Sequence, residues 1–145
     1  MILALDVGNT NIVIGCIENG EIIFNGRLTT HSYKTDMEFA VMLKNILTIN
    51  NIDVNAFEGA IISSVVPPID KALKTAVEIV TGKEPVTLDG CEGLKVSLDD
   101  PTQLGSDLIV GAVTVLNDFP PPIVLIDMGT ATTLFDIDKT GTYLG

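Results

Sequence analysis

Apolar residues dominate three successive short stretches at the start of the chain, at 2–7, 11–18 and 21–29. Stretches of this length and composition, bounded by turn residues, are typical of β-strands. The connections are the tight turns "GNT" and "ENGE", and the second contains the Asn-Gly pair that two-residue hairpins favour. The pattern therefore predicts an antiparallel meander of three strands.

The pattern then changes to helical spacing in "TDMEFAVMLKNILTIN", residues 35–50. Thr35 and Glu38 stand in the relation of a capping box, which predicts that the helix begins there. The continuous apolar run at 59–66 predicts a buried strand, with serines at 63 and 64 that can satisfy amides of the next helix.

That next helix is predicted to begin at Pro67-Pro68 and to end near Gly82. "EPVTLD" predicts a short strand, and a further helix is expected from about Thr102 to Asn117, where "DFPPP" ends it. The glycines of "DGCEG" and "GLKVSL" indicate turns.

The last segment, "PIVLIDMGTATTLFDID", predicts a strand, a glycine turn and a second strand, and "KTGTYLG" predicts the opening of a third. The whole element order is that of a ribonuclease-H-like (actin-like ATPase) α/β domain, a mixed sheet with flanking helices. The final segment restarts the same order. We therefore expect a first domain over 1–118 and the truncated beginning of a second, similar domain over 119–145.

A short internal repeat carries the candidate chemistry: "LALDVGNTNIVIG" is echoed by "VLIDMGTATTLFD". In the first copy, Gly8 permits a positive φ, so that the amides of Gly8, Asn9 and Thr10 can converge on phosphate oxygens. Asp6, at the carboxyl end of its strand, can hold Mg²⁺. For one copy alone, a hairpin with an acid that accepts amide bonds is the plainer interpretation, but the duplication favours a phosphate site.

The second copy offers Asp127, Gly129, Thr130 and Thr132 in the same arrangement. Two such turns, one from each domain, would hold a triphosphate between them. No Walker-type loop is present, because the Gly82-Lys83 pair lacks the upstream glycine and follows a helix.

The charge of the chain limits its partners. With 8 Lys and Arg against 19 Asp and Glu, the formal net charge is -11, which disfavours nucleic acid and anionic membrane surfaces. An anionic ligand would need a cation or oriented amides. Cys16 and Cys91 fit neither a disulfide framework nor a metal spacing, and with no basic leader or membrane-length apolar run we expect a cytoplasmic protein.

Asp107, in "QLGSDLIVGA", is a candidate general base near the start of a predicted helix. The small neighbours Gly105 and Ser106 leave room for a substrate beside its carboxylate, as proton removal from an attacking alcohol requires. The alternative is an acid that stabilises the helix N-terminus through the dipole.

The motifs "DVGNTN", "ISSVVPP", "DPTQLGSD" and "DMGTATT", in this order, resemble the type III pantothenate kinase family of the acetate and sugar kinase, heat-shock ATPase and actin superfamily. In that family ATP donates its γ-phosphate to the 4'-hydroxyl of pantothenate, the first step of coenzyme A biosynthesis. Mg²⁺ and a monovalent cation, K⁺ or NH₄⁺, take part.

The resemblance implies that Asp107 is the proton acceptor and that Asp127 binds the monovalent cation. It implies ATP contacts at Asp6, Val7, Gly8, Asn9, Thr10, Asn11, Ile12, Val13, Gly129 and Thr130. It implies pantothenate contacts at Leu98, Gly105, Ser106, Asp107 and Leu108.

Two positions depart from the family pattern, which has a tyrosine at Leu98 and a carboxylate-binding arginine at Leu108. Three alternatives therefore stay open: a kinase for another small alcohol, a phosphohydrolase, and a non-catalytic nucleotide-binding or regulatory homologue. Family members continue past Gly145. Because the "PIVLIDMG" strands would otherwise be half uncovered, we expect a homodimer or strand exchange to cover them.

Overall fold

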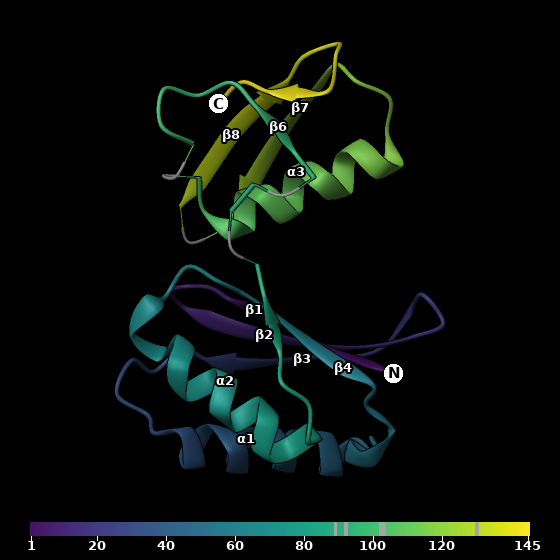
Figure 1. Ribbon diagram of the computed structural model, residues 1–145, viewed down its shortest axis with the longest axis vertical. Coiled ribbons are helices and arrows are strands. Elements are labelled where there is room, and N and C mark those ends of the chain that lie inside the picture. Colours follow the sequence, from purple (N-terminus) through teal and green to yellow (C-terminus); the bar gives the residue numbers. More distant parts are fainter. Residues whose placement is uncertain (89, 92, 102–103, 130) are drawn as a thin grey trace. The chain divides into compact units, whose positions relative to one another are not determined.

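The computed structural model describes residues 1–88, 90–91, 93–101, 104–129 and 131–145. The chain forms two compact units, Met1–Leu88 and Asp89–Gly145, and each is considered by itself (Figure 1). The predicted domain boundary at 118/119 rests on repeated topology rather than on compactness. The boundary at 118/119 stays a prediction. The helix that ends at Asp118 belongs to the second compact unit, which begins at Asp89.

The first unit contains a five-stranded sheet in the order β3-β2-β1-β4-β5. Its strands are β1 (Ile2–Val7), β2 (Asn11–Glu18), β3 (Glu21–Thr29), β4 (Gly59–Ser64) and β5 (Val86–Thr87). β1 to β3 form the predicted antiparallel meander, and β4 joins β1 in parallel. In the hairpin between β2 and β3, Asn19 and Gly20 have φ of 52° and 83°, as the Asn-Gly turn requires.

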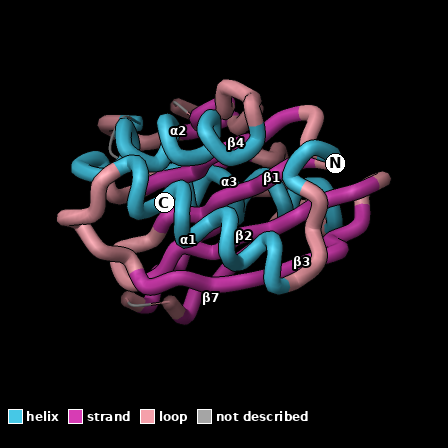
Figure 2. Tube along the Cα trace, turned by 90° about the horizontal axis from the view of Figure 1, so that it is seen from below, coloured by secondary structure: helices cyan, strands magenta, loops and turns pink. Residues whose placement is uncertain are grey.

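Two helices pack together on one side of this sheet (Figures 1 and 2). α1 (Asp36–Ile49) begins with the predicted capping box, and α2 (Pro67–Thr81) begins at its prolines and ends at Gly82 in the left-handed conformation. A short 3-10 helix, η1 (Val54–Ala56), precedes β4.

The core of the first unit lies between the sheet and these helices. It includes the fully buried Leu3, Leu5 and Val7 of β1 together with Leu43 of α1 and Leu73 of α2. Because side chains alternate along a strand, Asp6 lies on the opposite face of the sheet, where its side chain is exposed.

The second unit has a four-stranded sheet in the order β6-β9-β8-β7 and, within its described residues, the α-helix α3. Its elements are β6 (Lys95–Val96), α3 (Ser106–Asp118), β7 (Ile123–Met128), β8 (Thr132–Ile137) and β9 (Thr142–Tyr143). β7 and β8 form an antiparallel hairpin, β9 continues it, and β6 pairs in parallel with β9. The observed order of elements confirms the predicted fold class.

Three details differ from the sequence expectations. α3 begins at Ser106 rather than near residue 102, because Gly105 has extended backbone angles and forms its N-cap. Gly90 and Gly93 have the positive φ of the expected turns, but the short strand β6 that follows was not predicted; it pairs in parallel with β9. The strand expected over 59–66 ends at Ser64. No helix in the described ranges is long and apolar enough to cross a membrane.

Candidate phosphate and acceptor site

The first predicted phosphate turn follows β1 and brings Asp6 to the end of its strand. Asp6 lies opposite Val13 of β2 and Ser63 of β4 in the sheet register. The connection is closed by a hydrogen bond of 2.9 Å from the Gly8 amide to the Asn11 carbonyl. The acid and the turn are therefore adjacent, as predicted.

The reason for the glycine in this turn is different from the one expected. Gly8 does not adopt the positive φ that a glycine permits. At Gly8, a Cβ would lie 3.3 Å from the Asn11 carbonyl oxygen, so the requirement is close backbone approach. The Gly8 amide is also occupied, and we find no hydrogen bond from the Asn9 amide to any described residue.

Thr30, immediately after β3, donates two hydrogen bonds to the same turn. Its hydroxyl donates to the Gly8 carbonyl over 2.7 Å, and its amide donates to the Thr10 carbonyl over 2.9 Å. Both carbonyls therefore face Thr30.

The side chains of the remaining predicted nucleotide contacts divide between core and surface. Val7 and Ile12 are buried in the core and can offer only backbone atoms to a ligand. Asn9 and Thr10 are exposed, whereas Asn11 and Val13 are partly exposed. The ligand-facing groups of this turn are thus the polar side chains and the backbone.

The end of β4 adds a polar pair beside the turn. The Ser64 hydroxyl donates to Asp70 Oδ1 over 2.6 Å and accepts the Val66 amide over 3.1 Å. Ser64 thus accepts the amide of Val66, the residue before α2, and not an amide of the helix itself as predicted. The sequence analysis did not predict Asp70 as the partner of Ser64. Its place in the first turn of α2, six residues after Ser64, was a usable signal.

The second predicted turn, in the second unit, also follows a strand that carries an aspartate in its penultimate position. Asp127 is exposed near the end of β7 and lies opposite Thr133 of β8. A Cβ at Gly129 would lie 3.8 Å from Asp127 Oδ1, so the turn passes close to the carboxylate. Thr130, the predicted phosphate contact, lies outside the described residues.

Asp107 lies in the first turn of α3 with an exposed side chain. Its Oδ1 accepts the amide of Leu108 over 2.8 Å. Gly105 is the N-cap, and its carbonyl accepts the Ile109 amide over 3.2 Å, while Ser106 is buried. The first turn thus fixes the backbone and leaves the carboxylate at the surface.

Leu98 and Leu108, the two departures from the family pattern, pack against the core of the second unit. That core contains Tyr143, which the sequence did not single out. Burial raises the pKa of the Tyr143 phenol, and the negative charges of Asp107 and Asp136 raise it further. The candidate base and a buried phenol are therefore electrostatic neighbours.

The carboxylate oxygens of the candidate site suit a cation that is also bound by the oxygens of a phosphate ligand. The described residues include no cluster of three or more Asp, Glu, His or Cys that could hold a metal by itself. Mg²⁺ is commonly bound by one or two carboxylates, with phosphate and water oxygens completing its shell. The exposed carboxylate of Asp6 is compatible with this mode.

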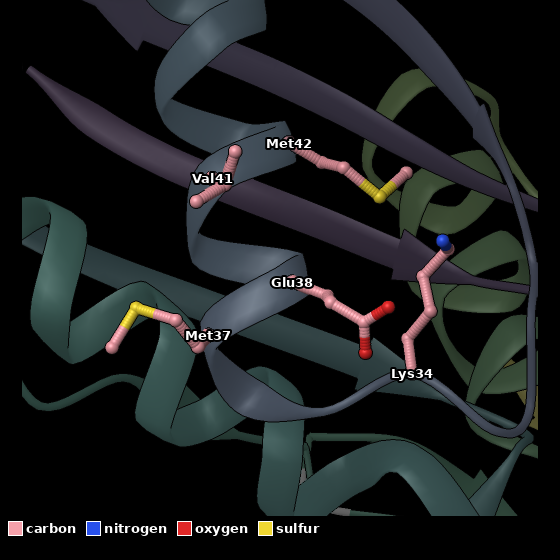
Figure 3. Close-up of a pocket in the computed structure, with 5 residues that line it drawn as sticks. All are labelled: Lys34, Met37, Glu38, Val41 and Met42. Atoms are coloured by element: carbon pink, nitrogen blue, oxygen red, sulfur yellow. The ribbon is translucent and has the colours of Figure 1, made fainter.

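A surface pocket of about 270 Å³ elsewhere on the first unit has a structural explanation (Figure 3). It is lined by Lys34, Met37, Glu38, Val41 and Met42. Glu38 Oε2 accepts the Thr35 amide over 2.8 Å, and these bonds to Thr35 lower the pKa of Glu38, with a smaller contribution from Lys34. The carboxylate caps α1 and is not part of either turn.

Comparisons with known proteins identify the sequence relatives. A family model described as "Type III pantothenate kinase" matches residues 2–145. A type III pantothenate kinase from Listeria welshimeri is 39% identical over 147 residues, which cover all of this chain and 57% of that protein. The chain thus spans little more than half the length of this relative.

Solved structures align with the chain at low sequence identity and with TM-scores below 0.5. YeaZ from Pseudomonas aeruginosa aligns with a TM-score of 0.47 and 8% identity, over 99% of this chain and 64% of its own. The PPX-GPPA enzyme of Aquifex aeolicus aligns with a TM-score of 0.41 and 11% identity, over 95% of this chain and 48% of its own.

Proposed function

The chain belongs to the type III pantothenate kinase family, as its motifs predicted, and we propose that it supplies the nucleotide turns and the base of an ATP-dependent kinase. The proposed reaction transfers the γ-phosphate of ATP to a hydroxyl of a small alcohol. By family resemblance that alcohol is pantothenate, and the product is 4'-phosphopantothenate.

The observation that supports this proposal is the structural equivalence of the two turns. β1 and β7 are both six-residue strands with an aspartate in the penultimate position, Asp6 and Asp127. Each is followed by a connection of three residues, 8–10 and 129–131, and then by an antiparallel partner strand. One ordinary hairpin would not need this arrangement, and its repetition favours a phosphate-binding role for each turn.

Asp6 is the proposed carboxylate for Mg²⁺, and Asp127 is the proposed ligand of a monovalent cation, K⁺ or NH₄⁺. Bound Mg²⁺ would neutralise charge on the phosphates, which a chain of net charge -11 cannot do through its side chains alone. In the proposed site, the exposed polar side chain of Asn9 in the first turn orients phosphate oxygens.

Asp107 is the proposed general base. Its exposed carboxylate can accept the proton of the acceptor hydroxyl as that oxygen attacks phosphorus. One carboxylate oxygen accepts the Leu108 amide, which fixes the orientation of the group. The other oxygen is then the proposed site of proton transfer.

The identity of the acceptor is the open part of the proposal. Leu98 and Leu108 pack against apolar residues, and neither can form an ion pair with a carboxylate. This favours two alternatives: a kinase for another small alcohol, and a homologue that binds nucleotide without catalysis. We further propose a cytoplasmic homodimer, since β7 is an edge strand with exposed apolar residues.

The test is a coupled ADP-release assay with the full-length protein, Mg-ATP and pantothenate. Wild-type protein is expected to release ADP when pantothenate is added. Asp107→Asn is expected to lower kcat by at least about 100-fold, the rate enhancement that general-base catalysis typically provides. Asp118→Asn, an exposed acid at the other end of α3, is the matched control and should keep wild-type activity.

Three results would contradict parts of this proposal. Binding of Mg-ATP without transfer to any alcohol would favour the non-catalytic homologue. ADP release without an acceptor would indicate a phosphohydrolase. Equal activity of Asp107→Asn and wild type would remove Asp107 as the base.

A further inference from the structure

The second unit brings a buried tyrosine to the end of α3 that carries the proposed base. Tyr143 is only 2% exposed, and its ring lies 4.9 Å from that of Phe135 between centroids. β9 carries it between β6 and β8, where it pairs with Val96 and Ile137. The position of the ring is therefore fixed by the sheet and by aromatic packing.

A glycine on α3 allows this aromatic pair to approach the helix. A Cβ at Gly111 would lie 3.8 Å from Phe135 Cζ, so the ring packs directly over Gly111. Asp107 precedes Gly111 by four residues and therefore lies on the same face of the helix, one turn nearer its N-terminus. Tyr143 lies in the core against which Leu108, the neighbour of Asp107, packs, and the charge of Asp107 reaches the phenol and raises its pKa.

The phenol hydroxyl is not engaged within the part of the chain that the structure describes. We find no hydrogen bond from it to any described residue, and no fully buried side-chain oxygen among those residues lacks a partner. The hydroxyl is therefore not fully enclosed, although the residue as a whole is only 2% exposed. Burial and the charges of Asp107 and Asp136 raise the pKa of the phenol, so it keeps its proton and can donate.

The charges around this hydroxyl select what it can bind. The second unit contains nine Asp and Glu residues against two lysines, Lys95 and Lys139. A substrate carboxylate at the Tyr143 hydroxyl would meet the carboxylates of Asp107 and Asp136 without a compensating cation. An uncharged oxygen, in a hydroxyl or an amide, pays no such electrostatic cost.

We propose that Tyr143 is a specificity-determining substrate contact, whose hydroxyl donates a hydrogen bond to an uncharged oxygen of the phosphoryl acceptor beside Asp107. This inference rests on the proposed kinase function. According to this inference, both α3 and β9 contribute residues that contact the phosphoryl acceptor. The part of the acceptor next to Asp107 must then be uncharged.

The test compares Tyr143→Phe with wild type in the full-length protein, because phenylalanine keeps the ring packing and removes only the hydroxyl. Tyr33→Phe, at a tyrosine that is 97% exposed, is the matched control. The acceptors are pantothenate and pantothenyl alcohol, which share two hydroxyls and the amide, while the alcohol has a third hydroxyl in place of the carboxylate.

Tyr143→Phe is expected to raise the KM for both acceptors by about tenfold, the value of one substrate hydrogen bond. The KM for ATP and the melting temperature should not change, which separates substrate contact from a structural role. Tyr33→Phe should match wild type in every measurement.

Three results would overturn the inference. If wild type and Tyr143→Phe have the same acceptor KM, Tyr143 does not contact the substrate, while the kinase function stands. If only the KM for pantothenate rises, the partner is the carboxylate and the assignment of a neutral oxygen is wrong. If wild-type protein phosphorylates neither alcohol, the proposed function fails and this inference fails with it.

Discussion

The Thr30 hydroxyl donates a hydrogen bond of 2.7 Å to the carbonyl of Gly8, a residue that precedes it by 22 positions. The Thr30 amide simultaneously holds the Thr10 carbonyl. The end of β3 therefore tethers the turn that follows β1. Asp6 lies on β1, directly before this turn. The residue that follows β3 therefore helps to hold the proposed phosphate site in shape.

Thr30→Val should loosen this tether, because it removes the hydroxyl and keeps the size and the backbone amide of the residue. We expect a loss of about 1 kcal/mol in the free energy of unfolding, the net value of one hydrogen bond. The KM for Mg-ATP should rise by about fivefold. Thr29→Val, at an exposed position of the same strand, is the control, and equal KM values for the two variants would contradict the prediction.

Ser64 and Asp70 should contribute to stability as a pair. Ser64→Ala leaves the Val66 amide and the Asp70 carboxylate without this hydroxyl, and we expect it to lower the free energy of unfolding by about 1 to 2 kcal/mol. Denaturant unfolding of Ser64→Ala, Asp70→Ala and the double variant measures the coupling. Strictly additive losses would show that the 2.6 Å contact contributes nothing.

The sequence predicts those elements whose signals are local. The hairpin at Asn19 and Gly20 and the helix that begins with Thr35 and Glu38 are each determined by residues within four positions of one another. The strands of the meander follow because their apolar runs are bounded by these turns. The position of Asp6 on the exposed face then follows from alternation.

The missed features depend on residues that are distant in the chain. β6 exists through its pairing with β9, and the role of Gly8 depends on how closely the chain returns at Asn11. Tyr143 could not be assigned to the Asp107 neighbourhood from the sequence, because Phe135 and the missing side chain of Gly111 bring them together. Such packing leaves no periodic signal.

Cys16 should make stability fall in alkali. Burial raises the pKa of its thiol from 9.0 to about 11. Because the folded value is the higher one, its contribution is complete below pH 9 and is lost as pH rises towards 11, by up to about 3 kcal/mol. Denaturant unfolding between pH 8 and 11.5 should show a smaller decrease for Cys16→Val than for wild type, and parallel curves would contradict the prediction.

The outer face of the β7–β8 hairpin should mediate association of the isolated 145-residue chain. Val124, Ile126, Met128 and Leu134 are each between 59% and 82% exposed on this hairpin. Ile126→Lys should therefore shift the chain from dimer to monomer in sedimentation measurements. Ile79→Lys, at an exposed apolar position of α2, is the control. A wild-type chain that stays monomeric at high concentration would contradict this prediction.

Asp6 and Asp127 should differ in the cation that each supports, although their strands are built alike. Asp6→Asn keeps the size of the side chain and removes its charge, so in the full-length protein it should raise the Mg²⁺ concentration for half-maximal activity by at least about tenfold. Asp127→Asn should instead raise the K⁺ requirement and leave the Mg²⁺ dependence unchanged. Asp53→Asn, at the N-cap of η1, controls for loss of a surface charge. If the two variants shift both cation dependences equally, the turns do not have separate cation roles, and only a general electrostatic effect remains.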